Sequence, residues 1–283
     1  MATGSFFKAD KSLGQHWLND DNILDEIVYL ADLNSSDHVL EIGPGTGNLT
    51  KKLIQKCSVM AVELDQKLYL KLKNLNLINL ELINESILKF DFNIMPKQYK
   101  IVANIPYYLT SNLIRVLSSL DNKPQLIILL VQNEIATRLT AKPGQYSLLG
   151  LTAQFYFDIQ EGPFVSRNAF YPIPKVDSKI IILKPKSKLL LADADSQKFF
   201  KLIKTGFASK RKTLFNNLRI VYKDQCSKLL DLGSIGVDPK MRAQELSLST
   251  WLKIFNYLEK SSPPNIPQSS PLARAVSQHD FLI

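Results

Sequence analysis

The chain has 283 residues, enough for one large and one small domain, and its 45% hydrophobic and 22% charged residues exclude a collagen-like or wholly disordered protein. The net charge of +9 favours a polyanionic partner, either nucleic acid or an anionic membrane surface. The longest strongly apolar run, 126–131, is too short to span a bilayer, and residues 1–12 lack the apolar core of a signal peptide. The two cysteines, Cys57 and Cys226, show neither CxxC pairing nor metal-ligand spacing. We therefore expect a soluble, cytoplasmic protein with free thiols and no bound metal.

From residue 38 to about residue 183, short apolar runs alternate with longer amphipathic stretches. The intervening stretches carry apolar residues at helical spacing, so the pattern predicts βαβ units and a mostly parallel sheet. Two later segments, 151–160 and 178–185, are predicted as strands that complete the sheet. The five earlier runs, predicted as strands buried on both faces, are 38–43, 58–64, 80–84, 100–104 and 126–132.

A change of pattern after Pro185 predicts a domain boundary. We place the first domain at 1–186, and the helical spacing that follows predicts a small all-helical domain at 187–260. Residues 261–283 are rich in Ser and Pro and cannot easily form a core, so they are predicted to be a disordered tail.

A glycine-rich turn follows the first predicted strand and includes Gly43 and Gly45. Glycines there let the backbone approach a ligand closely and leave the next helix N-terminus free to interact with it. Glu63 ends the next strand, 20 residues after Gly43, where an open α/β fold places a carboxylate against ribose hydroxyls. A tight structural turn is the alternative. The spacing G-x-G-x-G differs from the G-x-G-x-x-G of dinucleotide binders, which argues against NAD.

The fourth predicted strand ends in Asn104-Ile105-Pro106-Tyr107. The N6 lone pair of adenine is delocalised into the ring, so this amine is a poor nucleophile. The side-chain oxygen of Asn104 and the carbonyl of Ile105 can each accept one N6 hydrogen bond, which would aim the lone pair at a methyl donor. Pro106 rigidifies the turn, and Tyr107 offers a face for stacking an extruded base. The alternative is a structural loop with a capping Asn and packed tyrosines.

From Lys11 to about Leu258, the chain resembles the KsgA/Dim-type ribosomal RNA adenine dimethyltransferases, which share their catalytic domain with the erythromycin-resistance methyltransferases. The resemblance implies an α/β class I methyltransferase fold, with a Rossmann-like, mostly parallel sheet and a small all-helical C-terminal domain. It also implies N6,N6-dimethylation of two adjacent adenosines in a hairpin near the 3′ end of small-subunit (16S) ribosomal RNA. The motifs that carry it are SLGQHWL (12–18), EIGPG (41–45), ELD (63–65), ANIPYY (103–108), VQNEIATRL (131–139), FYPIPKVDSKI (170–180), KRKTLFNNL (210–218) and DPKMRAQEL (238–246).

The same resemblance places S-adenosylmethionine, the methyl donor, in the first domain. It implies that His16 and Leu18 close over the cofactor. The alternative for His16 is a residue that only packs the N-terminal segment. Gly43 and its neighbours, Gly45 among them, would lie beside the methionine moiety, and Glu63 would hold the ribose.

For the target base, the resemblance implies that Asn104 sits between the cofactor and the amine. Tyr107 and Phe170 would sandwich the adenine, whereas Phe170 by itself is more typical of a core aromatic. At one position the chain departs from the family, which usually carries an Asp at the adenine end of the cofactor. An ungapped match puts Ser86 there, and the neighbouring Glu85 is the alternative.

A basic stretch lies between Asp195 and Asp224, where no acidic residue occurs. It contains eight basic residues: Lys198, Lys201, Lys204, Lys210, Arg211, Lys212, Arg219 and Lys223. We interpret it as a phosphate-binding surface, with a merely solvated face as the alternative.

The leading hypothesis is an S-adenosylmethionine-dependent rRNA adenine dimethyltransferase that acts, as a monomer and away from membranes, on 16S rRNA within a 30S precursor particle. A second hypothesis is a methyltransferase of adenine in large-subunit rRNA or DNA, because the Asn-x-Pro-aromatic motif does not distinguish these polymers. A third is an RNA-binding assembly factor whose methyl transfer is secondary.

Overall fold

The computed structural model describes residues 14–259 and contains two compact units, which meet in the chain after Gln197. The predicted tail at 261–283 lies outside the described residues. The division falls inside helix α7 (Asp193–Gly206), eleven residues beyond the boundary that the sequence predicts after residue 186. We describe each unit by itself.

The first unit contains a seven-stranded sheet with the order β4-β3-β2-β5-β6-β9-β7. Strands β4 to β6 in this order run parallel, while β9 pairs antiparallel with both β6 and β7. The predicted mostly parallel sheet is therefore confirmed. The strands are β2 (His38–Ile42), β3 (Ser58–Val62), β4 (Leu80–Ile83), β5 (Lys100–Asn104), β6 (Leu126–Gln132), β7 (Phe157–Val165) and β9 (Ser178–Pro185).

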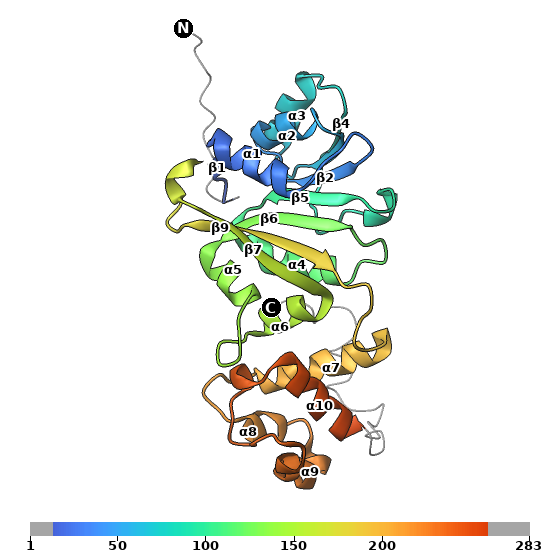
Figure 1. Ribbon diagram of the computed structural model, residues 1–283, viewed down its shortest axis with the longest axis vertical. Helices are drawn as coiled ribbons and strands as arrows, with labels where there is room; N and C mark the ends of the chain where they lie inside the picture. The colour runs from blue at the N-terminus through green and yellow to red at the C-terminus, as the bar shows by residue number, and fades with distance from the viewer. Residues whose placement is uncertain (1–13, 260–283) are drawn as a thin grey trace. The chain divides into compact units, whose positions relative to one another are not determined.

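Helices cover both faces of this sheet, which explains why the inner strands are continuous apolar runs (Figure 1). Residues of α4 (Thr110–Ser118), α5 (Asn133–Leu139) and α6 (Leu148–Tyr156) join one core, and residues of α1 (Asp21–Leu30) and α2 (Asn48–Leu53) join the other. Strand β6 contributes alternate side chains to the two cores: Ile127, Leu129 and Val131 on one face, and Leu126, Ile128 and Leu130 on the other.

The strand predicted at 151–160 is wrong in its first half, because helix α6 extends to Tyr156 and β7 begins at Phe157. Ser147 caps this helix, its Oγ accepting from the amide of Gly150 at 3.1 Å. A Cβ on Gly150 would lie 2.2 Å from the carbonyl oxygen of Arg138, so the helix lies closer to the backbone of Arg138 than a residue with a side chain would allow. Its apolar residues surround most of its circumference, and such a run has no period that separates a buried helix from a strand.

Two features of the first unit position the site. The strand order reverses at β2, since β3 and β4 lie on one side and β5 and β6 on the other, and such a reversal leaves a crevice at the carboxyl ends of the strands. Separately, the short strand β1 (Trp17–Leu18) pairs antiparallel with β8 (Phe170–Tyr171), which joins the N-terminal segment to the chain before β9.

The second unit is built from residues 198–206 of α7, α8 (Leu214–Leu218), α9 (Cys226–Leu230) and α10 (Leu248–Glu259), and its described residues contain no strand. Phe199 packs edge-on against Phe255, with ring centroids 5.6 Å apart. A Cβ on Gly206 would lie 2.3 Å from the ring of the fully buried Trp251, so only glycine fits under this indole. The small all-helical domain predicted for this region is confirmed. Between residues 14 and 259, no helix is long and apolar enough to cross a membrane.

Candidate active site

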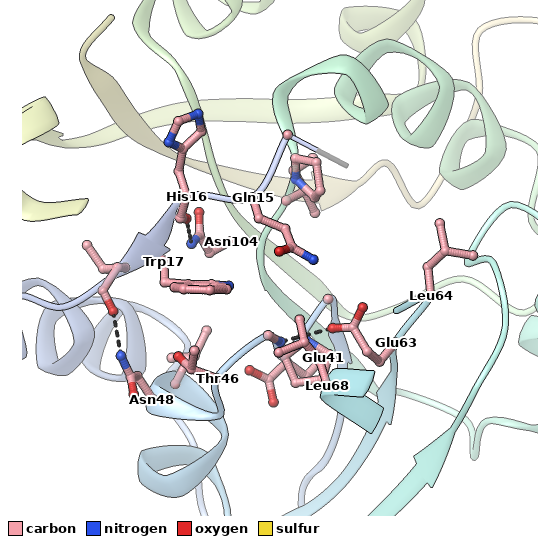
Figure 2. A pocket seen from close by; sticks show the side chains of 18 of the residues that line it. Gln15, His16, Trp17, Glu41, Thr46, Asn48, Glu63, Leu64, Leu68 and Asn104 are labelled. Carbon is pink, nitrogen blue, oxygen red and sulfur yellow. Dashed lines mark hydrogen bonds between the residues drawn. The ribbon is translucent and has the colours of Figure 1, made fainter. Parts of the chain in front are cut away.

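A pocket opens at the carboxyl ends of β2, β3 and β5, where the strand order reverses (Figure 2). Four chain segments far apart in the sequence contribute to its wall. They are 14–18, 43–46, 63–64 and 104–108, joined by Leu24, Glu41, Asn48, Leu49 and Leu68.

The glycine-rich turn after β2 forms the floor of this pocket. Gly43, Gly45 and Gly47 have φ values of +67°, +58° and +83°, a region that side chains other than glycine rarely adopt. A Cβ on Gly45 would lie 3.1 Å from Cδ1 of Trp17, and one on Gly47 would lie 2.5 Å from a methyl carbon of Leu72. The turn thus needs glycine for both conformation and space, and it exposes backbone to the pocket.

Glu63, directly after β3, links this turn to the start of α3 (Gln66–Asn74). One carboxylate oxygen accepts from the amide of Gly45 at 3.0 Å, and the other accepts from the amide of Asp65 at 2.8 Å. Burial raises the pKa of Glu63, while these backbone donors lower it. The side chain is therefore held in one place, with its carboxylate at the pocket wall.

Glu41, in β2 itself, is a second acid in the pocket and is only 1% exposed. Its Oε2 finds no hydrogen-bond partner among the described residues. Burial raises the pKa of Glu41 to about 8; the nearby Thr50 hydroxyl lowers it, and the charge of Glu63 raises it. This carboxyl therefore keeps its proton at neutral pH, and a cation beside it would favour the ionised form.

Asn104, the last residue of β5, lies on the opposite side of the pocket from the glycine turn (Figure 2). Its side-chain Nδ2 donates to the backbone carbonyl of His16 at 3.3 Å. This bond fixes the rotation of the amide, and none of the described residues donates to Oδ1. The amide oxygen is thus the atom that can accept a hydrogen bond from a substrate.

Tyr107 begins the 3-10 turn Tyr107–Leu109 after this strand. Its hydroxyl is hydrogen-bonded to the fully buried Oγ side chain of Ser178 at 2.9 Å, and its ring lies nearly parallel to that of His16, with centroids 5.9 Å apart. Burial raises the pKa of Tyr107, so the phenol is neutral. Tyr108 next to it is 57% exposed at the pocket wall. The rings of Tyr107 and Tyr108 therefore line the same pocket as Asn104.

The structure brings most of the predicted site residues to this pocket. Those that line it are His16, Leu18, Gly43, Gly45, Glu63, Asn104, Pro106 and Tyr107. Three others do not line it: Phe170, Glu85 and Ser86.

Phe170 is 3% exposed and pairs with Leu18 in the β1–β8 ribbon, so it belongs to a core of the sheet. Glu85 and Ser86 are half-buried in the loop after β4. The adjacent Asn84 donates from Nδ2 to the backbone carbonyl of Glu63 at 2.8 Å, which holds this loop close to the acid.

Several pocket residues were not predicted, and four of them have side chains that shape the site or its contacts. The indole of Trp17 lies across the pocket above the glycine turn (Figure 2), Glu41 is the buried acid, and Asn48 donates from Nδ2 to the carbonyl of Leu18 at 2.9 Å. Gln15 donates from Nε2 to Asp65, the N-cap of α3, at 2.9 Å. The motifs at 12–18 and 41–45 contain three of these residues, but nothing in the sequence distinguishes Asn48 from an ordinary surface residue.

The residues present fit S-adenosylmethionine. The glycine turn offers bare backbone, Glu63 stands where a ribose is bound in open α/β folds, and Glu41 offers an unsatisfied carboxyl to a cationic ligand. Between residues 14 and 259, no group of three or more His, Cys, Asp or Glu side chains is placed to hold a metal ion.

A sheet that reverses at β2, a G-x-G-x-G turn, an acid after β3 and Asn-Ile-Pro-Tyr after β5 together define a class I S-adenosylmethionine-dependent methyltransferase. The family described as "Ribosomal RNA adenine dimethylase" matches residues 6–260. The chain belongs to this family, and it is an enzyme that methylates adenine in ribosomal RNA.

Individual relatives agree with this assignment. The chain is 40% identical to "Ribosomal RNA small subunit methyltransferase A" of Rippkaea orientalis, over 89% of this chain and 98% of the relative. A protein with the same description from Dehalococcoides mccartyi is 38% identical, over 90% of each chain. Among solved structures, a dimethyladenosine transferase from Plasmodium falciparum aligns with a TM-score of 0.70 and 32% identity, covering 84% of this chain and 95% of that one. The 23S rRNA methyltransferase ErmE aligns with a TM-score of 0.68 and 26% identity, covering 86% and 99%.

The buried carboxyl of Glu41 predicts a pH-dependent stability. Its pKa rises from 4.5 in the unfolded chain to about 8 in the folded one, so between these values the native state keeps a proton that the unfolded state releases. The folded protein therefore loses stability as the pH rises through that window. Relative to wild type, Glu41→Gln should therefore gain on the order of a few kcal/mol of unfolding free energy between about pH 5 and pH 8. Urea titrations of the cofactor-free protein measure the difference, and parallel pH profiles for both proteins would contradict it.

Proposed function

We propose that this enzyme dimethylates N6 of two adjacent adenosines in a hairpin near the 3′ end of 16S rRNA, as a cytoplasmic monomer that acts on a 30S precursor particle. The observation that carries the chemistry is the Asn104 amide, whose nitrogen is held by His16 and whose oxygen is left to the substrate. The choice of the small subunit is supported by the descriptions of the relatives at 38–40% identity.

A large-subunit target is the second candidate, supported by the likeness to the 23S rRNA methyltransferase ErmE at 26% identity. One observation favours the small subunit over it: the higher identity to relatives named for that subunit. Methylation mapping of both rRNAs from cells with and without this protein tests the choice. Loss of N6,N6-dimethyladenosine from large-subunit rRNA alone would overturn our proposal.

When bound, S-adenosylmethionine supplies a methyl group on a positively charged sulfur. The backbone of Gly43 and Gly45 would lie along its methionine part, Glu63 would hold the ribose, and Glu41 would face the cation. Because Glu63 is removed from water, the attraction of its carboxylate for a positive charge is screened little, and Glu41 adds to this attraction once it releases the proton that burial makes it keep.

On the substrate side, Oδ1 of Asn104 and the carbonyl of Ile105 would each accept one hydrogen bond from N6. Both acceptors lie on the rigid end of β5, so the amine is oriented before reaction, and its lone pair is turned away from the ring. Tyr107 would stack on the extruded base. The alkylated amine is acidic enough to release its proton to water, so no strong general base is required.

The first prediction from this scheme concerns Asn104. Asn104→Ala removes the side-chain acceptor for N6, and methyl transfer should fall by roughly 10²-fold or more, the scale of one preorganised polar contact. Affinity for RNA should not change, because phosphate contacts determine it. Single-turnover methylation of small-subunit particles, with RNA binding measured in parallel, provides the test. Near-normal turnover would remove Asn104 from the mechanism.

The second concerns the adenine end of the cofactor, where we propose Ser86 as the acceptor for the adenine amino group. A carboxylate would make a charge-assisted bond, roughly twice as strong as that of the neutral hydroxyl. Ser86→Asp should therefore hold or tighten S-adenosylmethionine binding, and Glu85→Ala should change it little. Calorimetric titration of both variants is the measurement. A large loss from Glu85→Ala, with none from Ser86→Ala, would transfer the role to Glu85.

The basic stretch includes an exposed loop between α7 and α8, and we propose that it binds RNA phosphates. Lys210, Arg211 and Lys212 are all exposed there. The buried Asn217 braces the loop, since its Nδ2 donates to the carbonyls of Gly206 at 2.7 Å and Ser209 at 3.0 Å. A braced loop presents its charges at lower entropic cost than a free one.

The third prediction follows from this loop. Replacing Lys210, Arg211 and Lys212 by Ala should weaken RNA binding and reduce the slope of log K against log salt by about 2, because fewer counterions are released. Affinity for S-adenosylmethionine should stay the same. A matched control replaces Lys56, Lys97 and Lys123, which are exposed and precede the amino ends of β3, β5 and β6. Equal effects of both triple variants on the slope would mean that the loop has no special role.

A further inference from the structure

We propose that the His16 imidazole is a positioning residue for methyl transfer, which holds the loop at 171–177 and the ring of Tyr107 in register with the catalytic amide. This inference rests on the proposed role of Asn104, and it assigns His16 more than contact with the cofactor. Three separate contacts of one residue carry it.

The first contact is made by the backbone of His16, whose carbonyl accepts from Nδ2 of Asn104 at 3.3 Å. The N-terminal segment therefore determines which way the catalytic amide points. Any displacement of this segment rotates the amide, and a displacement near 1 Å at a reacting group is costly to the rate.

The second contact is made by the side chain, whose Nδ1 lies 2.7 Å from the carbonyl oxygen of Pro172. A carbonyl oxygen only accepts, so the proton of this bond is on Nδ1. Through this bond the imidazole holds the start of the loop at 171–177.

The third contact is the stacked arrangement of the His16 ring with Tyr107, whose hydroxyl in turn bonds to Ser178, the residue after the loop. The loop is thus held at its start by His16 and at its end through Tyr107. Removing the imidazole would release the start of the loop directly. It would also remove the ring that packs on Tyr107, the residue that holds the end of the loop.

The surface that this loop presents suits nucleotides beside a target base. Tyr171, Ile173 and Val176 are 49%, 60% and 43% exposed, and Lys175 is exposed among them. Aromatic and aliphatic groups with one cation suit unstacked bases and a phosphate. Its position therefore affects how the RNA aligns with Asn104.

Other contacts hold the N-terminal segment on the cofactor side, without the imidazole. The side chain of Gln15 donates to Asp65, and that of Asn48 donates to the carbonyl of Leu18. The backbone amide of Asn19 donates to the carbonyl of Ala169 at 2.9 Å. The cofactor pocket should therefore survive the loss of the His16 ring. This separation distinguishes a positioning role from a cofactor contact.

Three variants dissect the two functions of the ring. His16→Asn keeps a short donor near the position of Nδ1, His16→Phe keeps the stacked ring and removes the donor, and His16→Ala removes both. The expected single-turnover rate at saturating S-adenosylmethionine is lower by about 3- to 10-fold for His16→Asn and for His16→Phe, each of which keeps one of the two contacts, and lower again for His16→Ala. The dissociation constant of S-adenosylmethionine should stay within about twofold in all three. His38→Phe, at the exposed amino end of β2, is the matched control and should change neither quantity.

Two outcomes would overturn the proposal: an unchanged rate in His16→Ala, or a loss of S-adenosylmethionine affinity in His16→Phe as large as the loss of rate. A measurement without RNA keeps this test apart from the proposed function. Nitrogen-15 NMR of the free protein, which has three histidines, should assign the Nδ1–H form to His16, with the signal absent in His16→Phe. The Nε2–H form would refute the bond to Pro172 even if the RNA target were correct, whereas a wild-type enzyme inactive on small-subunit particles would refute only the target.

Discussion

The strand order reverses at β2, and this reversal decides where the chain can bind a ligand. The connection after β2 leads to β3 on one side, while β5 lies on the other, so the carboxyl ends of these strands are left uncovered. Each strand then delivers one group to the same crevice: the glycine turn from β2, Glu63 from β3 and Asn104 from β5. If the strands were paired in the order of the sequence, β3 and β4 would separate β5 from β2, and Asn104 would lie away from the glycine turn.

Within that crevice, electrostatics favours a positively charged ligand. Glu41 and Glu63 are both buried, and burial raises the pKa of each. Two backbone amides donate hydrogen bonds to the Glu63 carboxylate and offset the cost of its burial, whereas one oxygen of Glu41 has no hydrogen-bond partner among the described residues. A cation in the pocket would lower the pKa of both acids and favour their ionised forms, and a neutral ligand of the same shape would not. The same buried acids that cost stability in the free protein thus favour a sulfonium cofactor.

The segment at 14–18 ties the cofactor side of the site to the target side. It lines the pocket, it pairs through β1 with β8, and it contacts Asn104 and Tyr107 through His16. Movements of this segment therefore affect both the cofactor and the catalytic amide. Such an arrangement links the two binding events physically, because one element supplies contacts to both.

The sequence by itself determined the parallel sheet, the bounds of β5 and β6, the glycine turn and the Asn-Ile-Pro-Tyr motif. These features depend on local rules, namely the apolar period, the conformational freedom of glycine and the rigidity of proline. Only the tertiary structure decided that the first half of 151–160 is a helix and that Phe170 is buried against Leu18. It also decided that Asn48 and the Glu41 carboxyl belong to the pocket wall. The reason is distance along the chain: His16 meets Pro172 across 156 positions and Asn104 across 88, and no local pattern encodes which distant segments fold against each other.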